Sequence, residues 1–380
     1  MERNSIVDII GNLPTPVFAV DRSLLEHNAR ILDGVRRKSG AKILLALKAF
    51  SMFSTFGLLR DYLDGICASS PHEARLGKEE FGREVHSFAA AFGSGDYREI
   101  ERYSDHIVFN SMAQYEKYYR TGSAITYGLR INPEHCEAEV PLYDPCAPYS
   151  RLGIPSRHMP TTLPEGISGL HFHTLCEQDS FALERTFRAV ELKFGRLFGQ
   201  CEWLNLGGGH HITREGYDIE HLCSIISHIR RTYGCGVYLE PGEAVALNTG
   251  YLAATVLDIV ENGMEIAILD TSAAAHTPDV LEMPYRPHVT GSGMPKEKEY
   301  TYRLAGLSCL AGDVFGDYSF DRPLSVGDRV VFTDMAIYSM VKTNTFNGLS
   351  LPDIVYFDST TKEILHTKTF GYSDFKERLS

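Results

Sequence analysis

Short apolar runs alternate with longer amphipathic stretches over roughly the first two thirds of the chain. Eight runs have the composition of buried strands, and they cover 42–47, 65–69, 85–89, 106–109, 125–131, 167–172, 202–206 and 236–240. Between most of them, apolar residues recur at helical spacing opposite a polar face, as in 71–81, 111–119, 180–194 and 217–233. Eight strands alternating with helices over about 200 residues are typical of a (β/α)8 barrel. The pattern therefore predicts an α/β fold built on a TIM-type barrel.

The rhythm changes near residue 248, where strand-like segments are joined by turn-rich connections with few helices. These segments cover 251–260, 264–270, 300–308, 329–333, 353–357 and 363–370. We therefore predict a barrel domain over 22–247, followed by a C-terminal β domain over 248–380. A short strand at 15–21 precedes a helix over 23–38, for which Ser23 is the expected N-cap. That strand is free to pair with the C-terminal sheet, which would join residues 1–21 to the β domain.

Composition places the chain among ordinary globular proteins. Hydrophobic residues make up 43% and charged residues 23%, which excludes a disordered chain. A formal net charge of -12 argues against nucleic acid as a partner and is compatible with a cationic small molecule. Residues 1–16 lack the pattern of a secretory leader, and no apolar run is long enough to cross a bilayer. We expect a cytoplasmic protein that binds neither nucleic acid nor membranes.

The eight cysteines are scattered along the chain without CxxC spacing. This distribution fits neither a zinc site nor a small disulfide framework. Reduced thiols in a cytosol are the simpler interpretation. The sequence therefore predicts no metal.

Lys48 lies at the far end of the apolar run 41–50. Removal of an ammonium group from water disfavours its charged form, so a lysine at the mouth of an apolar pocket keeps a usable lone pair. Amines of this kind form Schiff bases with carbonyl groups. The alternative is a strand-end lysine whose stem is buried and whose ammonium group reaches the surface.

Other reactive residues follow directly after other predicted strands. Active sites of such barrels lie at the C-terminal ends of the strands. Besides Lys48, this rim would carry His171 and His173, the glycines 207–209, and the segment 240–243. A glycine run alone is more often a turn, and a single histidine more often a core or surface residue. Together they favour a site, in which the glycines let backbone amides approach an anion such as phosphate.

These residues resemble the fold-type III pyridoxal-phosphate decarboxylases, an alanine-racemase-like family that acts on ornithine, arginine or diaminopimelate. The resemblance covers nearly the whole chain. It implies pyridoxal 5′-phosphate as cofactor, held covalently by Lys48, with His173 stacked on the ring and Glu240 facing the pyridinium nitrogen. The cofactor-binding glycines by this resemblance are Gly207, Gly208, Gly209 and Gly242.

Two C-terminal motifs extend the same resemblance. Residues 308–313 match the family segment whose cysteine and aspartate reach into the active site of the partner subunit, here Cys309 and Asp313. Residues 336–338 match the segment whose tyrosine, here Tyr338, touches the phosphate. The resemblance therefore implies a homodimer with shared sites, in which Cys309 donates the proton to Cα and Asp313 binds substrate.

Departures from the wider family concern the substrate. Glu243 stands where the family usually has an arginine, and 174–176 replaces a Gly-Ser pair, so two phosphate contacts are missing. With 270–276 and 278–286, these departures resemble the carboxynorspermidine/carboxyspermidine decarboxylase branch. Glu243 would pair with a cationic tail and repel the second carboxylate of diaminopimelate, although it can equally bond a backbone amide or a barrel arginine. Asp279 is a second candidate for the tail, with a helix cap or loop carboxylate as the alternative.

The prediction is a carboxy-lyase of polyamine biosynthesis that converts carboxynorspermidine to norspermidine and CO2. We expect it to act on carboxyspermidine too. The sequence does not rank the two substrates, because they differ by one methylene, worth about 1 to 3 kcal/mol in a pocket. The alternatives are a diaminopimelate or ornithine decarboxylase of the same fold, or a non-catalytic regulator that has lost the cofactor. Joint retention of Lys48, His173, Glu240 and Tyr338 argues against the regulator.

Overall fold

The computed structural model describes residues 6, 9–138 and 140–380, so the expectation for a leader at 1–16 falls partly outside it. The chain forms two compact units. One contains residues 27–245, and the other combines residues 1–26 with 246–380. Among the described helices, none is both long and apolar enough to cross a membrane.

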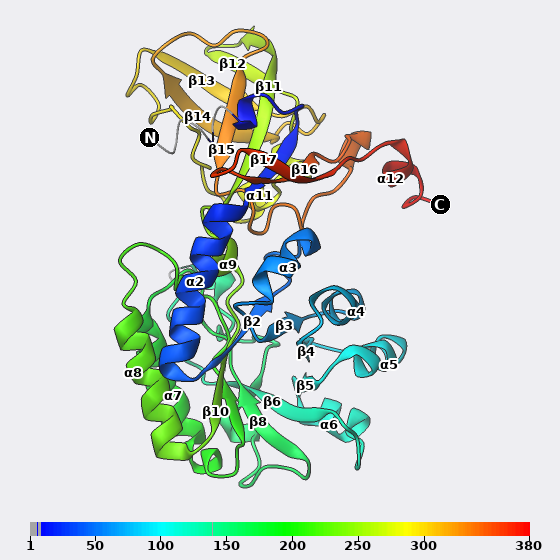
Figure 1. The fold of residues 1–380 in the computed structure, drawn as a ribbon, viewed down its shortest axis with the longest axis vertical. Helices are drawn as coiled ribbons and strands as arrows, with labels where there is room; N and C mark the ends of the chain where they lie inside the picture. Colours follow the sequence, from blue (N-terminus) through cyan, green and yellow to red (C-terminus); the bar gives the residue numbers. More distant parts are fainter. Residues whose placement is uncertain (1–5, 7–8, 139) are drawn as a thin grey trace. The chain divides into compact units, whose positions relative to one another are not determined.

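The unit of residues 27–245 is a closed barrel of parallel strands (Figure 1). Its strands are β2 (Lys42–Ala46), β3 (Gly65–Ala68), β4 (Glu84–Phe88), β5 (His106–Phe109), β6 (Thr126–Asn132), β8 (Ile167–His171), β9 (Trp203–Asn205) and β10 (Gly236–Leu239). Each pairs with the next in this order, and β10 pairs with β2 to close the ring. A short β7 (Ile154–Pro155) adds to β6. All eight predicted strands and the predicted fold class are confirmed.

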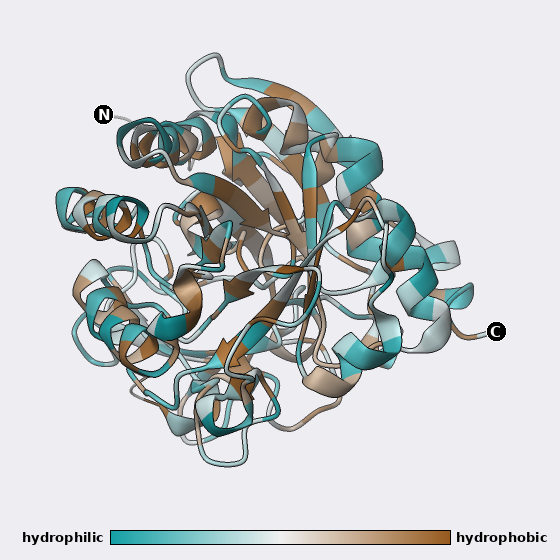
Figure 2. Cartoon of the chain, turned by 90° about the horizontal axis from the view of Figure 1, so that it is seen from below, coloured by the Kyte–Doolittle hydropathy of each residue, from teal (hydrophilic) through white to brown (hydrophobic). Residues whose placement is uncertain are grey.

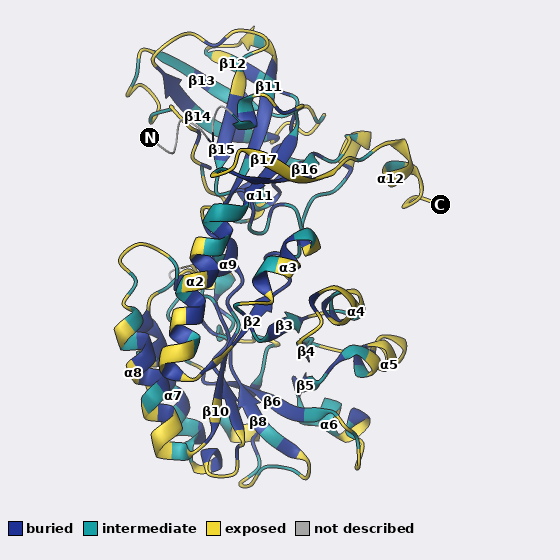
Figure 3. Cartoon of the chain, viewed as in Figure 1, coloured by how far each residue is buried: buried dark blue, intermediate teal, exposed yellow. Residues whose placement is uncertain are grey.

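Helices connect these strands and turn their polar faces outward, so that exposed residues lie on the helices and buried residues on the strands (Figures 2 and 3). They are α2 (Arg22–Ser39), α3 (Phe56–Leu59), α4 (Pro71–Leu76) with a π-helical turn (Gly77–Phe81), α5 (Ser94–Tyr103), α6 (Met112–Tyr118), α7 (Ser180–Phe198), α8 (Ile219–Tyr233) and α9 (Glu243–Ala246). Side chains of Ser70, Ser111, Asp179 and Asp218 accept N–H groups at the starts of α4, α6, α7 and α8.

The predicted N-cap of α2 was wrong by two residues. The helix begins at Arg22, and the Asp21 carboxylate accepts a hydrogen bond from the N–H of Ser23 at 2.9 Å. The Ser23 hydroxyl instead donates to Asp358 at 3.0 Å. An aspartate caps as well as a serine, and the hydrogen bond of Ser23 to Asp358 leaves the capping position to Asp21.

The barrel interior is filled by a cluster of Leu44, Val108, Trp203 and Tyr238. Trp203 is the largest of these side chains, and its ring needs the space above Gly169. A Cβ atom at position 169 would lie 2.1 Å from the indole ring, so only glycine fits there. Side chains of the described residues therefore fill the barrel interior, as in other barrels of this type, and leave no central pore.

The second unit is a mixed sheet with the strand order β14-β13-β12-β11-β1-β16-β17, and β15 pairs with β11. The strands are β1 (Val17–Asp21), β11 (Gly250–Glu261), β12 (Glu265–Leu269), β13 (Tyr300–Ala305), β14 (Val314–Phe320), β15 (Arg329–Thr333), β16 (Asp353–Asp358) and β17 (Glu363–Lys368), with short helices α10 (Ala273–His276), α11 (Asp279–Glu282) and α12 (Tyr372–Lys376). Strand β14 was missed, because Gly316 and Asp317 interrupt its apolar pattern.

The N-terminal strand β1 does pair into this sheet, as its position before the barrel allowed. It runs antiparallel to β11 and parallel to β16. Phe18 packs in one core of the unit, whereas Val17 and Ala19 pack in a second core on the other face. Because both faces of β1 are buried, it is a central strand of the sheet.

Candidate active site

The predicted rim residues come from four strands that are neighbours in the barrel. The sheet order β2-β10-β9-β8 places the turn with Lys48 beside the loops that follow β10, β9 and β8. Those loops carry Glu240, the glycines 207–209 and His173. The C-terminal ends of parallel strands meet at one edge, so four features that are far apart in the sequence are brought together.

Lys48 and His173 face each other at this rim. The Nζ atom of Lys48 lies 3.5 Å from Nε2 of His173. The Nδ1 atom of His173 accepts a hydrogen bond from the N–H of Gly208 at 3.0 Å, so a neutral ring carries its proton on Nε2. Burial, followed by the charges of Lys48 and Arg130, holds the pKa of His173 well below its usual value. The Lys48 side chain is exposed, whereas the sequence suggested an apolar mouth.

Glu240 is held as an anion. Its Oε1 accepts from the Asn205 amide at 2.7 Å, and Oε2 lies 3.2 Å from Nε2 of His171. Burial alone would raise its pKa, but the interactions with His171 and Asn205 outweigh burial and lower the pKa to about 2. A carboxylate has about four lone-pair positions, so Glu240 can still accept a proton-bearing group.

The three glycines are needed for close backbone packing between loops. A Cβ atom at Gly208 would lie 2.1 Å from the carbonyl oxygen of Glu240, and one at Gly209 would lie 1.9 Å from that of Leu175. In the described part of the chain, no group accepts a hydrogen bond from the N–H of Gly209 or of Gly242. Two backbone donors at the rim are therefore available to an anion.

Glu243 has a partner that the sequence did not predict. Its Oε2 lies 2.6 Å from Nε2 of His211, and both side chains are largely buried. The alternatives weighed for Glu243 were a substrate cation, a backbone amide or a barrel arginine. The signal for His211 was its place directly after the glycine run, in Gly209-His210-His211.

Arg130 is a further site residue that pattern analysis missed. It lies within the predicted strand 125–131, next to its last residue, and it is 5% exposed. Its guanidinium group donates to the carbonyl oxygen of His173 at 3.0 Å and lies 4.5 Å from the ring centre of Phe88. Burial lowers its pKa to about 10, against the opposing effect of Glu240. Arg130 therefore remains a cation that fixes the backbone at His173.

In the β unit, Asp313 is buried inside its own loop. One carboxylate oxygen accepts from the Ser272 hydroxyl at 2.8 Å and from the N–H of Ser308 at 3.0 Å, and the other accepts from the N–H of Ala274 at 3.2 Å. With 3% exposure, this side chain organises the segment 308–313. Its predicted contact with substrate remains a prediction.

The other candidates of the β unit differ in how they are held. Cys309 is exposed, and its N–H donates to the Asn347 side chain at 2.7 Å. Tyr338 lies in a turn with a positive φ of 52°. Asp279 begins α11 and forms an ion pair with Lys342, so a cation of the protein already balances it. Its predicted role toward a substrate tail is weaker for that reason.

Comparison with known proteins gives a consistent answer. Residues 17–336 match the family model described as pyridoxal-dependent decarboxylase, C-terminal sheet domain. A carboxyaminopropylagmatine decarboxylase from Synechocystis sp. is 44% identical over 97% of this chain and 96% of its own length. A carboxynorspermidine/carboxyspermidine decarboxylase from Campylobacter jejuni is 42% identical, covering 96% of this chain and 98% of that protein.

The chain belongs to the pyridoxal-dependent decarboxylases. A crystal structure of Campylobacter jejuni carboxynorspermidine decarboxylase complexed with norspermidine superimposes with a TM-score of 0.90 at 41% identity, covering 96% of this chain and all of that one. The predicted resemblance to this branch is confirmed. A pyridoxal-dependent decarboxylase is a carboxy-lyase, and the regulator alternative is set aside.

The rim fits the cofactor of a pyridoxal-dependent decarboxylase. Lys48 offers the amine, and the free N–H groups of Gly209 and Gly242 suit a phosphate. Glu240, with a pKa of about 2, is an anion that suits a protonated pyridine nitrogen. His173 would lie against the ring. The two N–H groups would supply phosphate contacts where the serine and arginine of the wider family are missing.

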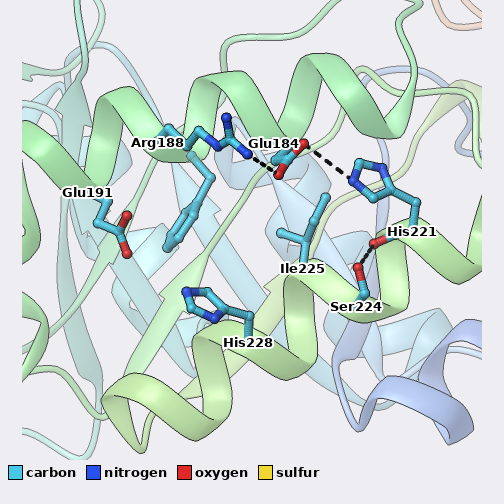
Figure 4. Close-up of a pocket in the computed structure, with 8 residues that line it drawn as sticks. Glu184, Arg188, Glu191, His221, Ser224, Ile225 and His228 are labelled. Carbon is cyan, nitrogen blue, oxygen red and sulfur yellow. Dashed lines mark hydrogen bonds and ion pairs between the residues drawn. The ribbon is translucent and has the colours of Figure 1, made fainter.

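A separate pocket lies between α7 and α8, in the outer helix layer of the barrel (Figure 4). Glu184 occupies its centre, with Arg188 at 2.6 Å and His221 at 3.4 Å. The first is an ion pair one helical turn apart, and the second joins the two helices. These contacts are typical of a helix–helix interface at the protein surface, and the pocket carries none of the predicted site residues.

Proposed function

We propose that this enzyme decarboxylates a carboxy-polyamine, with carboxynorspermidine and carboxyspermidine as its substrates and norspermidine or spermidine plus CO2 as products. The proposal rests on one observation above all. The Campylobacter jejuni relative of that name aligns over nearly the full length of both chains at 42% identity. A relative that aligns from end to end shares the whole fold of the site, and the 41% identical crystal structure is complexed with norspermidine, so homology at this level supports a carboxy-polyamine as the substrate class.

The residues of the rim support the same chemistry. Pyridoxal phosphate, when bound, supplies an electron sink for the electron pair that stays on Cα when CO2 leaves. Glu240 would keep the pyridine nitrogen protonated, and Lys48 would yield its place to the substrate amine and take it back after turnover. His173 would lie against the ring, and Arg130 holds the His173 backbone in place through its carbonyl oxygen. Glu243 would contribute a negative charge that attracts a cationic tail while its Oε2 atom stays paired with His211.

A second substrate is supported by the Synechocystis relative, which is named for carboxyaminopropylagmatine and is 44% identical. The tail of carboxyaminopropylagmatine ends in a guanidinium group, whereas the tail of carboxynorspermidine ends in an ammonium group. A guanidinium binds a carboxylate through two parallel hydrogen bonds. Both tails are cationic, so the negative charge of this chain is compatible with either.

A single assay separates these substrates. Purified protein with pyridoxal phosphate is given carboxynorspermidine, carboxyspermidine, carboxyaminopropylagmatine, diaminopimelate and ornithine, and CO2 release is followed. We expect kcat/KM to be highest for a carboxy-polyamine with a cationic tail. A preference for diaminopimelate or ornithine would overturn the proposal, and a preference for carboxyaminopropylagmatine would move it to the second substrate.

We further propose a cytoplasmic homodimer in which Cys309 and Asp313 serve the site of the other subunit. In support, the surface near Cys309 is apolar: Leu310 is 45% exposed and Phe346 is 46% exposed. The bond between Cys309 and Asn347 brings the two segments together. Exposed apolar side chains that cluster in this way are typical of interfaces.

Mixing of inactive subunits tests the shared site. Lys48→Ala and Cys309→Ala proteins, each inactive alone, are exchanged by mild unfolding and refolding. Random pairing would form about half heterodimers with one intact site each, and about a quarter of wild-type activity would return. If subunits exchange and the mixture stays inactive, or if size measurement finds a monomer, the shared-site proposal is wrong.

A further inference from the structure

A second cluster of reactive side chains lies inside the barrel, at the ends of the strands opposite to Lys48. Glu84 begins β4, His86 follows it two residues later, and His106 begins β5. His86 and His106 are register partners on these parallel strands. Their rings stack with centres 3.9 Å apart and planes 10° apart. One ligand atom from each of the three side chains lies within 4.8 Å of those from the other two.

Two nitrogens in this cluster are buried without a partner in the described part of the chain. They are Nδ1 of His86 and Nδ1 of His106. The His86 side chain is 2% exposed, and its other nitrogen, Nε2, lies 3.3 Å from a Glu84 oxygen. If Nε2–H donates to Glu84, Nδ1 of His86 carries an unprotonated lone pair, and no described group donates a hydrogen bond to it. Buried polar nitrogens in native proteins nearly always have a partner, so these two nitrogens are available to a cation or a hydrogen-bond donor.

A partly exposed lysine supplies the positive charge beside Glu84. Lys42 forms an ion pair with Glu84, and the Tyr238 hydroxyl donates to Glu84 at 3.3 Å. The Lys42 side chain is 47% exposed, so its ammonium group can move into water without leaving a buried charge. Glu84 is then available to another cation.

We propose that Glu84, His86 and His106 form a binding site for a divalent transition metal at the N-terminal end of the barrel strands. Two imidazoles and one carboxylate are a donor set used for Zn²⁺, Co²⁺ and Ni²⁺. Bonds of about 2.0 to 2.2 Å separate tetrahedral ligand atoms by about 3.4 Å. The stacked rings hold the two imidazole lone pairs in nearly parallel planes, so one ring must turn toward the other and the side chains must close by about an ångström when the metal binds, while the strands stay in place.

A metal here would be an exception to the sequence prediction of no metal, which the proposed experiment tests. That prediction searched for cysteine spacing, whereas these donors come from two different strands. The metal would link β4 to β5, and it would lie far along the strands from the decarboxylase rim. Its role would be to fasten the barrel, because N-terminal ends of barrel strands serve stability more than chemistry.

The single tryptophan of the chain reports on this site directly. The Trp203 ring centre lies 5.5 Å from that of His106. Holoenzyme dialysed against a chelator is titrated with Ni²⁺, whose open d shell quenches a nearby indole, and Zn²⁺ is then added as a non-quenching competitor. We expect saturable quenching at one equivalent, reversal by Zn²⁺, and a rise in melting temperature with Zn²⁺.

Four variants decide the outcome. Glu84→Gln and His106→Gln should each weaken Ni²⁺ binding at least about tenfold, and Lys42→Met should strengthen it because the competing cation is gone. His228→Gln, an exposed histidine on α8, is the matched control and should bind as wild type does. Should His106→Gln fail to fold, Glu84→Gln keeps the stacked histidines and still decides. Absence of saturable quenching in wild type, or equal affinity in Glu84→Gln, overturns the proposal.

Discussion

The two ends of the barrel carry the same kinds of side chain and use them differently. At the C-terminal end, Lys48 lies beside His173, and Glu240 lies beside His171. At the N-terminal end, the cluster described above likewise combines a lysine, a glutamate and two histidines. The difference is the pairing of the lysine. Lys42 is matched by a carboxylate, whereas the described contact of Lys48 is with a histidine.

The two glutamates reach the same ionisation state by different routes. In each case burial would raise the pKa, and other groups lower it to about 2. For Glu84 the opposing groups are His86 and the ammonium of Lys42, while for Glu240 they are His171 and the Asn205 amide. Glu240 is thus an anion held by a histidine and an amide, which leaves the nearby lysine free to react. The partners of a side chain, more than its type, decide its chemistry.

The largest expected effect separates the two lysines. Lys48→Ala should abolish turnover and also the borohydride-fixed pyridoxal adduct, because Lys48 is the lysine that lies beside His173 in the described part of the chain. Lys42→Met should keep both within about twofold, since Lys42 lies at the other end of the strands. Peptide mapping after borohydride reduction and a CO2 assay give the two readouts. An adduct that persists in Lys48→Ala would mean that another lysine holds the cofactor.

Next in size is the effect of removing one carboxylate at a time. Glu240→Gln should lower kcat by about a hundred- to a thousandfold, as does loss of one electrostatic group aimed at a reacting centre. Glu84→Gln should leave kcat unchanged under conditions where it is folded. Rates with saturating pyridoxal phosphate are compared at 25 °C after circular dichroism confirms the fold. Equal losses in both variants would refute the assignment of roles to the two ends.

A smaller effect is expected for Glu243. Glu243→Gln should reduce kcat/KM for the carboxy-polyamine by about ten- to a hundredfold through loss of a charge-assisted contact. A shorter amino acid that cannot reach position 243 is the control and should be affected much less. Asp279→Asn should matter less than Glu243→Gln, because Lys342 already pairs with Asp279.

Two other results for Glu243→Gln would change the interpretation. Loss of bound pyridoxal phosphate, or equal slowing of every substrate, would make Glu243 part of the cofactor scaffold. His211→Asn then shows whether Glu243 and His211 act as a unit. If they do, the double variant Glu243→Gln, His211→Asn should lower kcat/KM no more than either single variant does.

The smallest effect concerns acid stability at the N-terminal end. The pKa of Glu84 is about 2 in the folded chain, against 4.5 ordinarily. A carboxylate with a lowered pKa stabilises the fold above its unfolded pKa, and this contribution disappears as pH falls from about 4.5 through 2. Wild type should therefore exceed Glu84→Gln by about 1 to 2 kcal/mol in unfolding free energy at pH 6, with partial exposure taken into account.

Urea unfolding followed by Trp203 fluorescence measures this difference at pH 6, 4 and 3. The gap between wild type and Glu84→Gln should narrow steadily toward acid pH. A gap that stays constant would show that Glu84 gains nothing from its ionised state in the folded barrel.

The sequence by itself determined the barrel and the members of its reactive rim. Strand-length apolar runs at regular intervals leave few other folds, and residues that directly follow strands must meet at one edge. Lys48, His173, Glu240 and the glycine run could be found in this way because their positions depend only on the strand ends. The N-terminal strand at 17–21 was likewise placed by its hydrophobicity, although its partners in the sheet were open.

Only the tertiary structure decided which side chains contact one another. The pairing of Glu243 with His211, the support of His173 by Arg130, and the stacking of His86 on His106 all join different strands or loops. Their sequence separations are large and carry no periodic signal, so no local pattern reports them. Strand β14 was missed for a related reason, because Gly316 and Asp317 are disfavoured in strands and are tolerated there through pairing with β13. The sequence specifies which ionisable side chains are present. Contacts between distant strands determine their pKa values and their hydrogen-bond partners.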